Sequence, residues 1–316
     1  MATRTVKPSG GDYTTLSAWE AGRQGDLTGL GPEIAECSGN LSDTTAVTID
    51  GWTTTATDYI QIITPQADRH AGAWDTTKYR LEASVIFSRV LRILEDFVRL
   101  EGLQLAQTNT TTDAYEAVEY TGSANNSAVG LIDACIIKSV STNTANGNAV
   151  IIQNTQGTYT LRNSVLYTTG SDALNCSIAF VGTRACNIDN CTLIGTTYGL
   201  ESGAYDTITV RNTYAHGGTD AYTGSGITRT TCAHSSATSF TGSTASIAHS
   251  TANFISVTGG SQDYHLQSGA SATLLTGGTD LSGTFTVDID NQTRVDWGIG
   301  ADEYINSARR FILVRP

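Results

Sequence analysis

Four charged residues recur at the same place in a repeated segment, and they are the clearest candidates for chemistry: Asp133, Arg162, Asp189 and Arg211. Each is the second residue of a six-residue unit, and acid and base alternate from one unit to the next. If the units stack, these side chains point outward on one face, spaced by one coil. Such a row suits the hydroxyl or uronate groups of a glycan. It also fits a solvated ladder of ion pairs, each contributing about 0.2–1 kcal/mol, and the complementary signs favour that interpretation.

Catalysis on a glycan would need more than this row. Glycosidases use two carboxyl groups about 5–10 Å apart, one of them with a raised pKa. Asp133 and Asp189 lie two units apart and meet the distance, but Arg162 between them would lower the pKa of both carboxyl groups. Four further acids fall in expected loops with no pattern that brings them together: Asp172, Glu201, Asp206 and Asp220. We therefore predict no catalytic residues.

The sequence also predicts no metal ion and no cofactor. The five histidines do not have the spacing of metal ligands: His70, His216, His234, His249 and His265. The segment Asp288-Ile-Asp290 begins like a calcium loop but lacks the glycine and the distal glutamate of that motif. The sequence has no phosphate-binding loop, nucleophile elbow or zinc motif.

The elements that must position these residues are repeated strands. Six units align without gaps, and their starts are separated by 32, 29, 27, 22 and 19 residues: Leu100–Leu105, Ile132–Ile137, Leu161–Leu166, Ile188–Leu193, Val210–Ala215 and Arg229–His234. Self-similarity at this period is typical of a solenoid, in which each unit buries its apolar face only by stacking on its neighbours. Within a unit, period-two alternation is interrupted at the third residue, so the pattern predicts strand, corner, strand.

Asparagine occupies that third position in three successive units. Asn163, Asn190 and Asn212 suit a corner because asparagine tolerates the left-handed backbone conformation and forms local hydrogen bonds. A corner repeated on every coil would stack these side chains into an amide ladder. The arrangement is that of a right-handed parallel β-helix, and a leucine such as Leu161 should then point into its core.

The units resemble the "I-x-N-C-x-I" coils of the pectate-lyase-like β-helix superfamily. Residues 10–20, Gly-Gly-Asp-Tyr-Thr-Thr-Leu-Ser-Ala-Trp-Glu, resemble an opening segment common in β-helix proteins of bacteria and tailed bacteriophages. The segments 288–294 and 299–303 resemble the usual closing segment of those proteins. The resemblance implies the fold strongly and an activity weakly, because this scaffold carries lyases, hydrolases, adhesins and virion spikes alike.

We accordingly predict an all-β, single-domain solenoid in three parts. Residues 1–45 form the lead-in and a cap, in which a short helix through 15–21 covers the open end of the core, with Asp12 or Thr14 as its N-cap. Residues 46–287 form the parallel β-helix, and residues 288–316 form a C-terminal closing segment and tail. In the stretch 90–101, we expect two strands with a turn near residues 95–96 in place of a helix.

The six cysteines are expected to be reduced. Cys135, Cys191 and Cys232 share the fourth position of the repeat, and two coils separate the first two by about 10 Å, beyond the reach of a disulfide. They fit small buried core residues better. Cys186, which alternates with Ile188, should also point inward.

Composition excludes some partners. The formal net charge is −12, with only 18 Lys and Arg against 30 Asp and Glu, whereas nucleic-acid binding needs clustered basic residues. The same charge disfavours an anionic membrane surface, and no stretch is apolar enough for a transmembrane helix. The first ten residues contain no apolar run, so we expect no signal peptide.

The last residues form an apolar run flanked by arginines. It comprises Phe311, Ile312, Leu313 and Val314, preceded by Arg309 and Arg310. Because an uncovered run of this kind would be adhesive, we expect it to pack against a neighbouring copy or another virion protein. By resemblance to phage β-helix spikes, the expected state is a homotrimer. The alternative is that the run folds back over the last coil of its own chain.

Together these features favour a non-enzymatic virion surface protein of a tailed bacteriophage, such as a capsid decoration, spike or tail component that faces a glycan. It would be made in the host cytoplasm and would reside in the virion. The first alternative is a polysaccharide lyase or glycoside hydrolase on the same scaffold. The second is a bacterial surface adhesin, and for both alternatives the location would be secreted or cell-surface.

Overall fold

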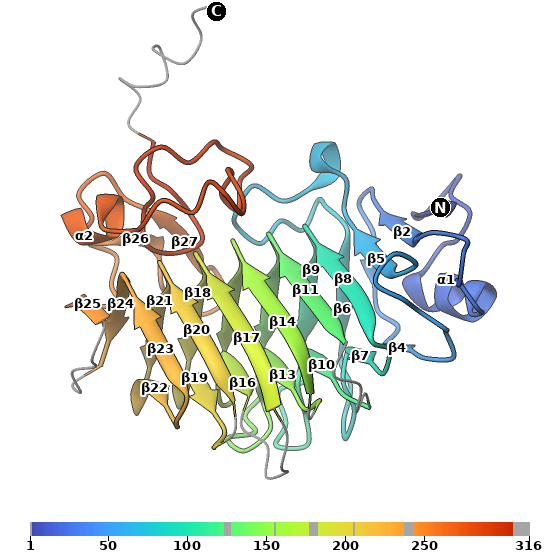
Figure 1. Cartoon of the computed structure of the whole chain (residues 1–316), viewed down its shortest axis with the longest axis horizontal. Helices are drawn as coiled ribbons and strands as arrows, with labels where there is room; N and C mark the ends of the chain where they lie inside the picture. The colour runs from blue at the N-terminus through green and yellow to red at the C-terminus, as the bar shows by residue number, and fades with distance from the viewer. Residues whose placement is uncertain are drawn as a thin grey trace, which may run out of the picture.

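The computed structural model describes residues 2–122, 128–154, 156–176, 183–204, 206–236 and 243–305. Three parallel sheets run along the long axis of the molecule, with their strands stacked side by side (Figure 1). In each regular coil the chain contributes one strand to sheet 1, turns a tight corner into sheet 2, and returns through sheet 3. The protein is thus a right-handed parallel β-helix, as the repeat predicts.

Every strand of the three sheets is short, as expected for a coil with three sides. Sheet 1 consists of β1 (Ala2–Val6), β2 (Glu33–Cys37), β5 (Ile60–Ile63), β8 (Phe97–Glu101), β11 (Val129–Asp133), β14 (Gln156–Arg162), β17 (Thr183–Asp189), β20 (Thr207–Arg211) and β23 (Ile227–Thr230). Sheet 2 consists of β3 (Ser42–Asp43), β6 (Arg80–Ala83), β9 (Gln104–Gln107), β12 (Ile136–Ser139), β15 (Val165–Thr168), β18 (Thr192–Gly195), β21 (Tyr214–Gly217), β24 (Cys232–Ser235) and β25 (Ser243–Ser246). Sheet 3 consists of β4 (Val47–Ile49), β7 (Leu91–Ile93), β10 (Val118–Tyr120), β13 (Val150–Ile152), β16 (Leu174–Cys176), β19 (Tyr198–Ser202) and β22 (Asp220–Thr223).

The core fills the space between the sheets, and its residues come from equivalent positions of successive coils. Leu161 pairs in register with Ile132 on one side and Ile188 on the other, and all three are buried. Stacking like residues in this way removes each apolar face from water only when the next coil is present. The predicted turn near residues 95–96 is also confirmed, because β7 ends at Ile93 and β8 begins at Phe97.

A short helix covers the N-terminal end of the core, as predicted. Helix α1 (Leu16–Arg23) buries Leu16 and Trp19, and the Trp19 ring stacks on Trp52 with 5.5 Å between the ring centroids. Its N-cap is Thr15, whose side chain accepts a hydrogen bond from Ala18 N. The prediction of Asp12 or Thr14 as the cap is wrong because the Asp12 carboxylate instead accepts hydrogen bonds from Thr5.

The coils begin earlier than residue 46. β1, β2 and β3 lie within the predicted lead-in 1–45, and β1 pairs in parallel with β2, which pairs in turn with β5. β2 alternates buried and partly buried residues from Glu33 to Cys37, as expected of a coil strand with one face on the core.

The last coil strand is β25, which ends at Ser246. The prediction that the solenoid continues to residue 287 is therefore wrong. The residues after Ser246 form an antiparallel hairpin of β26 (Phe254–Ser256) and β27 (Asp263–Leu266), then helix α2 (Ala272–Thr276) and the closing segment. This C-terminal lobe, residues 247–305, packs on the outer face of sheet 2 (Figure 1). The outer row of sheet 2 carries Ile136, Val165 and Tyr214, and these side chains would face water without the lobe.

All six cysteines are free and buried. Cys135, Cys191 and Cys232 have no exposed area, which confirms them as core residues. Cys186 also points inward, and its Sγ lies 3.8 Å from that of Cys176.

Candidate functional site

The corner between sheets 1 and 2 has the same backbone in all six repeat units. The third residue of every unit has a positive φ between 48° and 66°: Gly102, Ala134, Asn163, Asn190, Asn212 and Thr231. A single residue in this left-handed conformation redirects the chain from sheet 1 into sheet 2 without a loop. Asparagine or glycine adopts the conformation at the lowest cost. Asn212 Nδ2 donates to Asn190 Oδ1 at 3.1 Å, so two of the three asparagines form a direct amide ladder.

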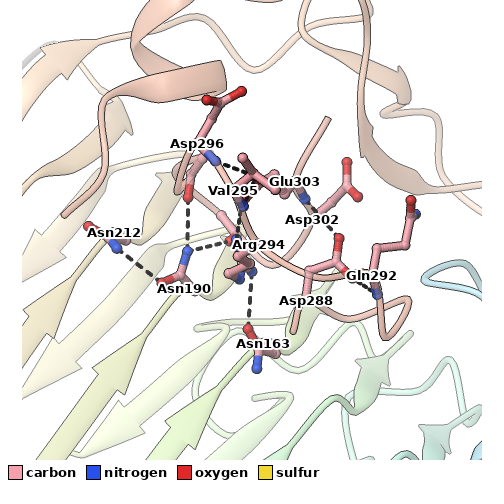
Figure 2. Close-up of polar contacts among 12 residues, drawn as sticks. Asn163, Asn190, Asn212, Asp288, Gln292, Arg294, Val295, Asp296, Asp302 and Glu303 are labelled. Atoms are coloured by element: carbon pink, nitrogen blue, oxygen red, sulfur yellow. Dashed lines mark hydrogen bonds and ion pairs between the residues drawn. The ribbon is translucent and has the colours of Figure 1, made fainter. Parts of the chain in front are cut away.

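The closing segment clasps this corner (Figure 2). Asn190 Nδ2 donates to Gly298 O at 2.8 Å, and Arg294 Nη2 donates to Asn163 Oδ1 at 3.0 Å. Asn212 Oδ1 accepts a hydrogen bond from Thr279 N at 2.7 Å. The asparagines therefore hold the C-terminal lobe against the β-helix. The repeat alone does not reveal this role.

The four predicted glycan-binding residues form two ion pairs on adjacent coils. Arg162 Nη2 lies 2.7 Å from Asp133 Oδ2, and Arg211 Nη2 lies 2.6 Å from Asp189 Oδ2. The Asp189 carboxylate is buried beneath its partner, while both guanidinium groups remain partly exposed. Because each carboxylate is neutralised by its neighbour, the row can act as a structural ladder without any ligand.

Two acids that the sequence did not connect meet on the outer face of sheet 3. Asn175 Nδ2 donates to Asp172 Oδ2 at 2.9 Å and to Glu201 Oε2 at 2.6 Å. Burial, a hydrogen bond with Glu201 and the charge of Glu201 raise the pKa of Asp172 to about 7. Glu201 lies in β19 and not in a loop, opposite Asn175 in the register of β16 and β19. The Asp172 carboxyl group therefore remains partly protonated near neutral pH.

A third acid from the expected loops, Asp206, pairs with a buried arginine. Arg184 has the same inward orientation in β17 as Cys186 and Ile188, and its Nε and Nη2 donate to Asp206 Oδ1 and Oδ2 at 3.0 and 2.7 Å. Arg184 also donates to the carbonyls of Asn154, Ile152 and Cys176. The pair closes the core at the corner between sheets 3 and 1.

The outer face of sheet 2 carries a groove with a volume of about 340 Å³. One wall is a row of side chains on successive strands, Tyr167, Ile194 and His216, and the other is formed by the C-terminal lobe. The remaining lining residues are Thr168, Thr169, Gly195, Thr196, Gly218, His249, Val257, Gly259, Gln262 and Tyr264. Hydroxyl, amide and imidazole groups thus surround aromatic rings, and the described part of the lining includes no carboxylate.

Two neutral histidines sit side by side in this groove. The rings of His216 and His249 have centroids 4.3 Å apart, and His249 also stacks on Tyr264 at 5.8 Å. Burial lowers the pKa of both imidazoles, and the neighbouring His216 helps to lower that of His249 to about 4. At neutral pH the groove therefore offers uncharged donors and acceptors on aromatic surfaces, a combination that suits a neutral polar ligand.

A second cluster of titratable side chains lies within the C-terminal lobe. His265 Nε2 lies 3.1 Å from both carboxylate oxygens of Asp290, and Nδ1 contacts Asp263 Oδ1. One ligand-type atom each from His265, Asp290 and Asp302 lies within 4.8 Å of the others. Burial disfavours charge on His265, but its hydrogen bonds with Asp263 and Asp290 outweigh burial and raise its pKa to about 11. These are the residues, among those described, that have the donor types and proximity of a metal site.

The suspected calcium-like segment serves as a turn. Asp288 Oδ1 accepts hydrogen bonds from Asp290 N at 3.0 Å and Gln292 N at 2.8 Å, and Oδ2 accepts one from Glu303 N (Figure 2). Burial raises the pKa of Asp288 to about 7, although the charge of Arg294 opposes that shift. The acidic residues of the closing motif thus organise its own backbone.

Residues 309–314, the predicted assembly tail, lie outside the described residues. None of the described helices has the length and hydropathy needed to cross a bilayer.

Comparison with known proteins gives a single kind of likeness, in fold. No protein-family model and no curated protein sequence matches this chain. Among solved structures, it is similar to the pectin methylesterase from Aspergillus niger, with a TM-score of 0.39 and 9% sequence identity over 73% of this chain and 82% of the esterase chain.

Proposed function

We propose that this protein is a non-enzymatic surface protein of a tailed-bacteriophage virion, and that it binds a glycan in the groove on sheet 2. The observation that carries the binding proposal is the composition of the groove. Tyrosine and histidine rings lie beside threonine hydroxyls and a glutamine amide, and such side chains recognise sugars through stacking and hydrogen bonds. The groove is a better candidate than the Asp133–Arg211 row, whose charges are already paired.

The groove favours binding over cleavage. A glycoside hydrolase needs two carboxyl groups on either side of the scissile bond, and the groove lining has none among the described residues. His216 and His249 are not joined to any carboxylate by the hydrogen bonds described here, so neither has the partner that usually orients a catalytic imidazole.

The virion location rests on the sequence. The opening segment 10–20 and the closing segment 288–303 resemble those of phage β-helix proteins, and the structure gives each a structural task, as an end cap and as a clasp. We propose that the apolar tail from residue 308 joins the protein to further copies, as a homotrimer, or to other virion proteins.

Glycan binding can be tested with a matched pair of threonine variants. Thr196 lines the groove, whereas Thr228 is exposed on β23 in sheet 1. On a glycan array, Thr196→Ala and His216→Ala should weaken binding to whichever glycan the wild type selects, and Thr228→Ala should bind as the wild type does. Equal binding by all four proteins would refute the groove as the site. Antibody labelling of intact particles tests the virion location, and labelling confined to host cells would refute it.

A carbohydrate-active enzyme is the second candidate, because of Asp172 and Glu201. A carboxyl group with a raised pKa beside a second carboxylate is a common catalytic arrangement. Both, however, share one amide donor, Asn175 Nδ2, which holds them closer than the water-accommodating separation of an inverting glycosidase. Polysaccharide turnover abolished by both Asp172→Asn and Glu201→Gln would favour this candidate.

A further inference from the structure

The C-terminal lobe contains a cluster whose donor set is unusual for a purely structural salt bridge. His265 is in β27, while Asp290 and Asp302 come from two separate parts of the closing segment. His265 and Asp290 alone would form an adequate ion pair. Asp302 nevertheless brings a further carboxylate oxygen within 4.8 Å of the other two ligand-type atoms, although its side chain is only 6% exposed.

The Asp302 carboxylate is only half satisfied. Oδ2 accepts a hydrogen bond from Leu266 N at 2.7 Å, whereas no hydrogen bond from the described residues reaches Oδ1. Oδ1 is therefore available to coordinate a cation. The charge of Asp290 adds to the negative potential around Asp302, and the charges of His265 and Arg294 oppose it.

The backbone of the chain approaches one side of the cluster closely. Gly72, in the loop after the 3-10 helix η1 (Gln66–Asp68), approaches the cluster with φ of +74°. A Cβ at this position would lie 2.1 Å from Asp290 Oδ1 and 2.3 Å from His265 Nε2. Any residue other than glycine would therefore clash with Asp290 and His265, so the backbone of Gly72 closes this side of the cluster.

From these contacts we propose that His265, Asp290 and Asp302 form a binding site for a divalent transition metal, with zinc as the preferred ion. Imidazole nitrogen and carboxylate oxygen are both zinc ligands, and the 3.1 Å between His265 Nε2 and Asp290 is close to the ligand separation in a tetrahedral site. Asp263 contacts His265 Nδ1 and fixes the ring so that Nε2 faces the metal. On binding, the Nε2 proton of the imidazolium passes to solvent, and its nitrogen lone pair forms the bond to the metal.

The site would join three separate segments of the C-terminal lobe. The metal would connect hairpin strand β27 to both ends of the closing segment, next to the loop that carries Gly72. Metal binding should therefore stabilise the C-terminal lobe on sheet 2 independently of any glycan in the groove.

Isothermal titration of chelator-treated full-length protein tests this proposal. The wild type should bind about one zinc ion per chain and melt at a higher temperature with zinc than without it. Asp302→Asn retains an acceptor for Leu266 N, and we expect its zinc affinity to fall at least about tenfold. Asp290→Asn provides a second, independent variant should the first fail to fold. Asp280→Asn alters an exposed acid of the same C-terminal lobe and serves as the matched control.

Zinc binding that is lost in Asp302→Asn and Asp290→Asn but kept in Asp280→Asn supports the proposal. X-ray absorption of the zinc complex should then show nitrogen and oxygen donors and no sulfur. The absence of zinc binding by the wild type, equal binding by all variants, or preferential binding of calcium or magnesium in parallel titrations would overturn it.

Discussion

The ion pair between Arg184 and Asp206 gives the sharpest test of how the core is closed at the corner between sheets 3 and 1. Arg184 occupies an inward position of β17, and the two side chains are 3% and 6% exposed. The guanidinium group has three hydrogen bonds with the Asp206 carboxylate and three with backbone carbonyls. Asp206→Asn removes the negative charge while preserving the shape of the side chain, and it leaves the Arg184 charge buried without compensation.

The expected cost follows from that burial. Removing one partner of a buried ion pair costs about 3–5 kcal/mol, because the remaining charge is desolvated and unpaired. Asp133→Asn is the matched control, since Asp133 and Arg162 form an equally short pair with side chains that are 17% and 23% exposed. Pairs of that kind contribute about 0–1 kcal/mol.

Urea denaturation followed by tryptophan fluorescence measures both changes in the free energy of unfolding. We expect Asp206→Asn to lose about 3–5 kcal/mol and Asp133→Asn at most about 1 kcal/mol. Similar small losses for both variants would refute the conclusion that Arg184 is buried and dependent on Asp206.

Three further predictions address the core, the sheet 3 acids and the tail. Leu161→Ala should destabilise the protein by about 2–5 kcal/mol in the same denaturation assay, because it leaves a cavity between Ile132 and Ile188. The raised pKa of Asp172 means that the folded state retains a proton that the unfolded state has released; stability should therefore fall as the pH rises from about 4 to about 7. In thermal melts across this range, Asp172→Asn should show a smaller decline, and an unchanged decline would contradict the raised pKa of Asp172. Deletion of residues 308–316 should abolish the oligomer, measured by native mass spectrometry, with a nearly unchanged melting temperature; an intact oligomer of a less stable chain would contradict the assembly proposal.

The coil architecture was predictable because its signals are local and repeated. A residue that must adopt a positive φ recurs at the third position of each unit, and the inward residues alternate around it. Asn163, Asn190 and Asn212 were informative because their side chains tolerate that backbone. The early coils were harder to predict, since β2 and β3 lack the six-residue pattern and only weak alternation marks them.

The candidate sites were not predictable in the same way, because each depends on contacts between distant segments. Asp172 and Glu201 meet through the register of β16 and β19, which the sequence does not specify. His265, Asp290 and Asp302 converge only because the closing segment folds back beside β27. The groove likewise requires the C-terminal lobe to pack on sheet 2 instead of continuing the coils.

We propose that the protein binds a glycan without cleaving it. The most direct measurement is the release of reducing ends and unsaturated uronates from a broad panel of polysaccharides, including every glycan that the protein binds. We predict no release above the level of a heat-denatured sample. Sustained release that is lost in Asp172→Asn or Glu201→Gln would contradict this account and identify the protein as an enzyme.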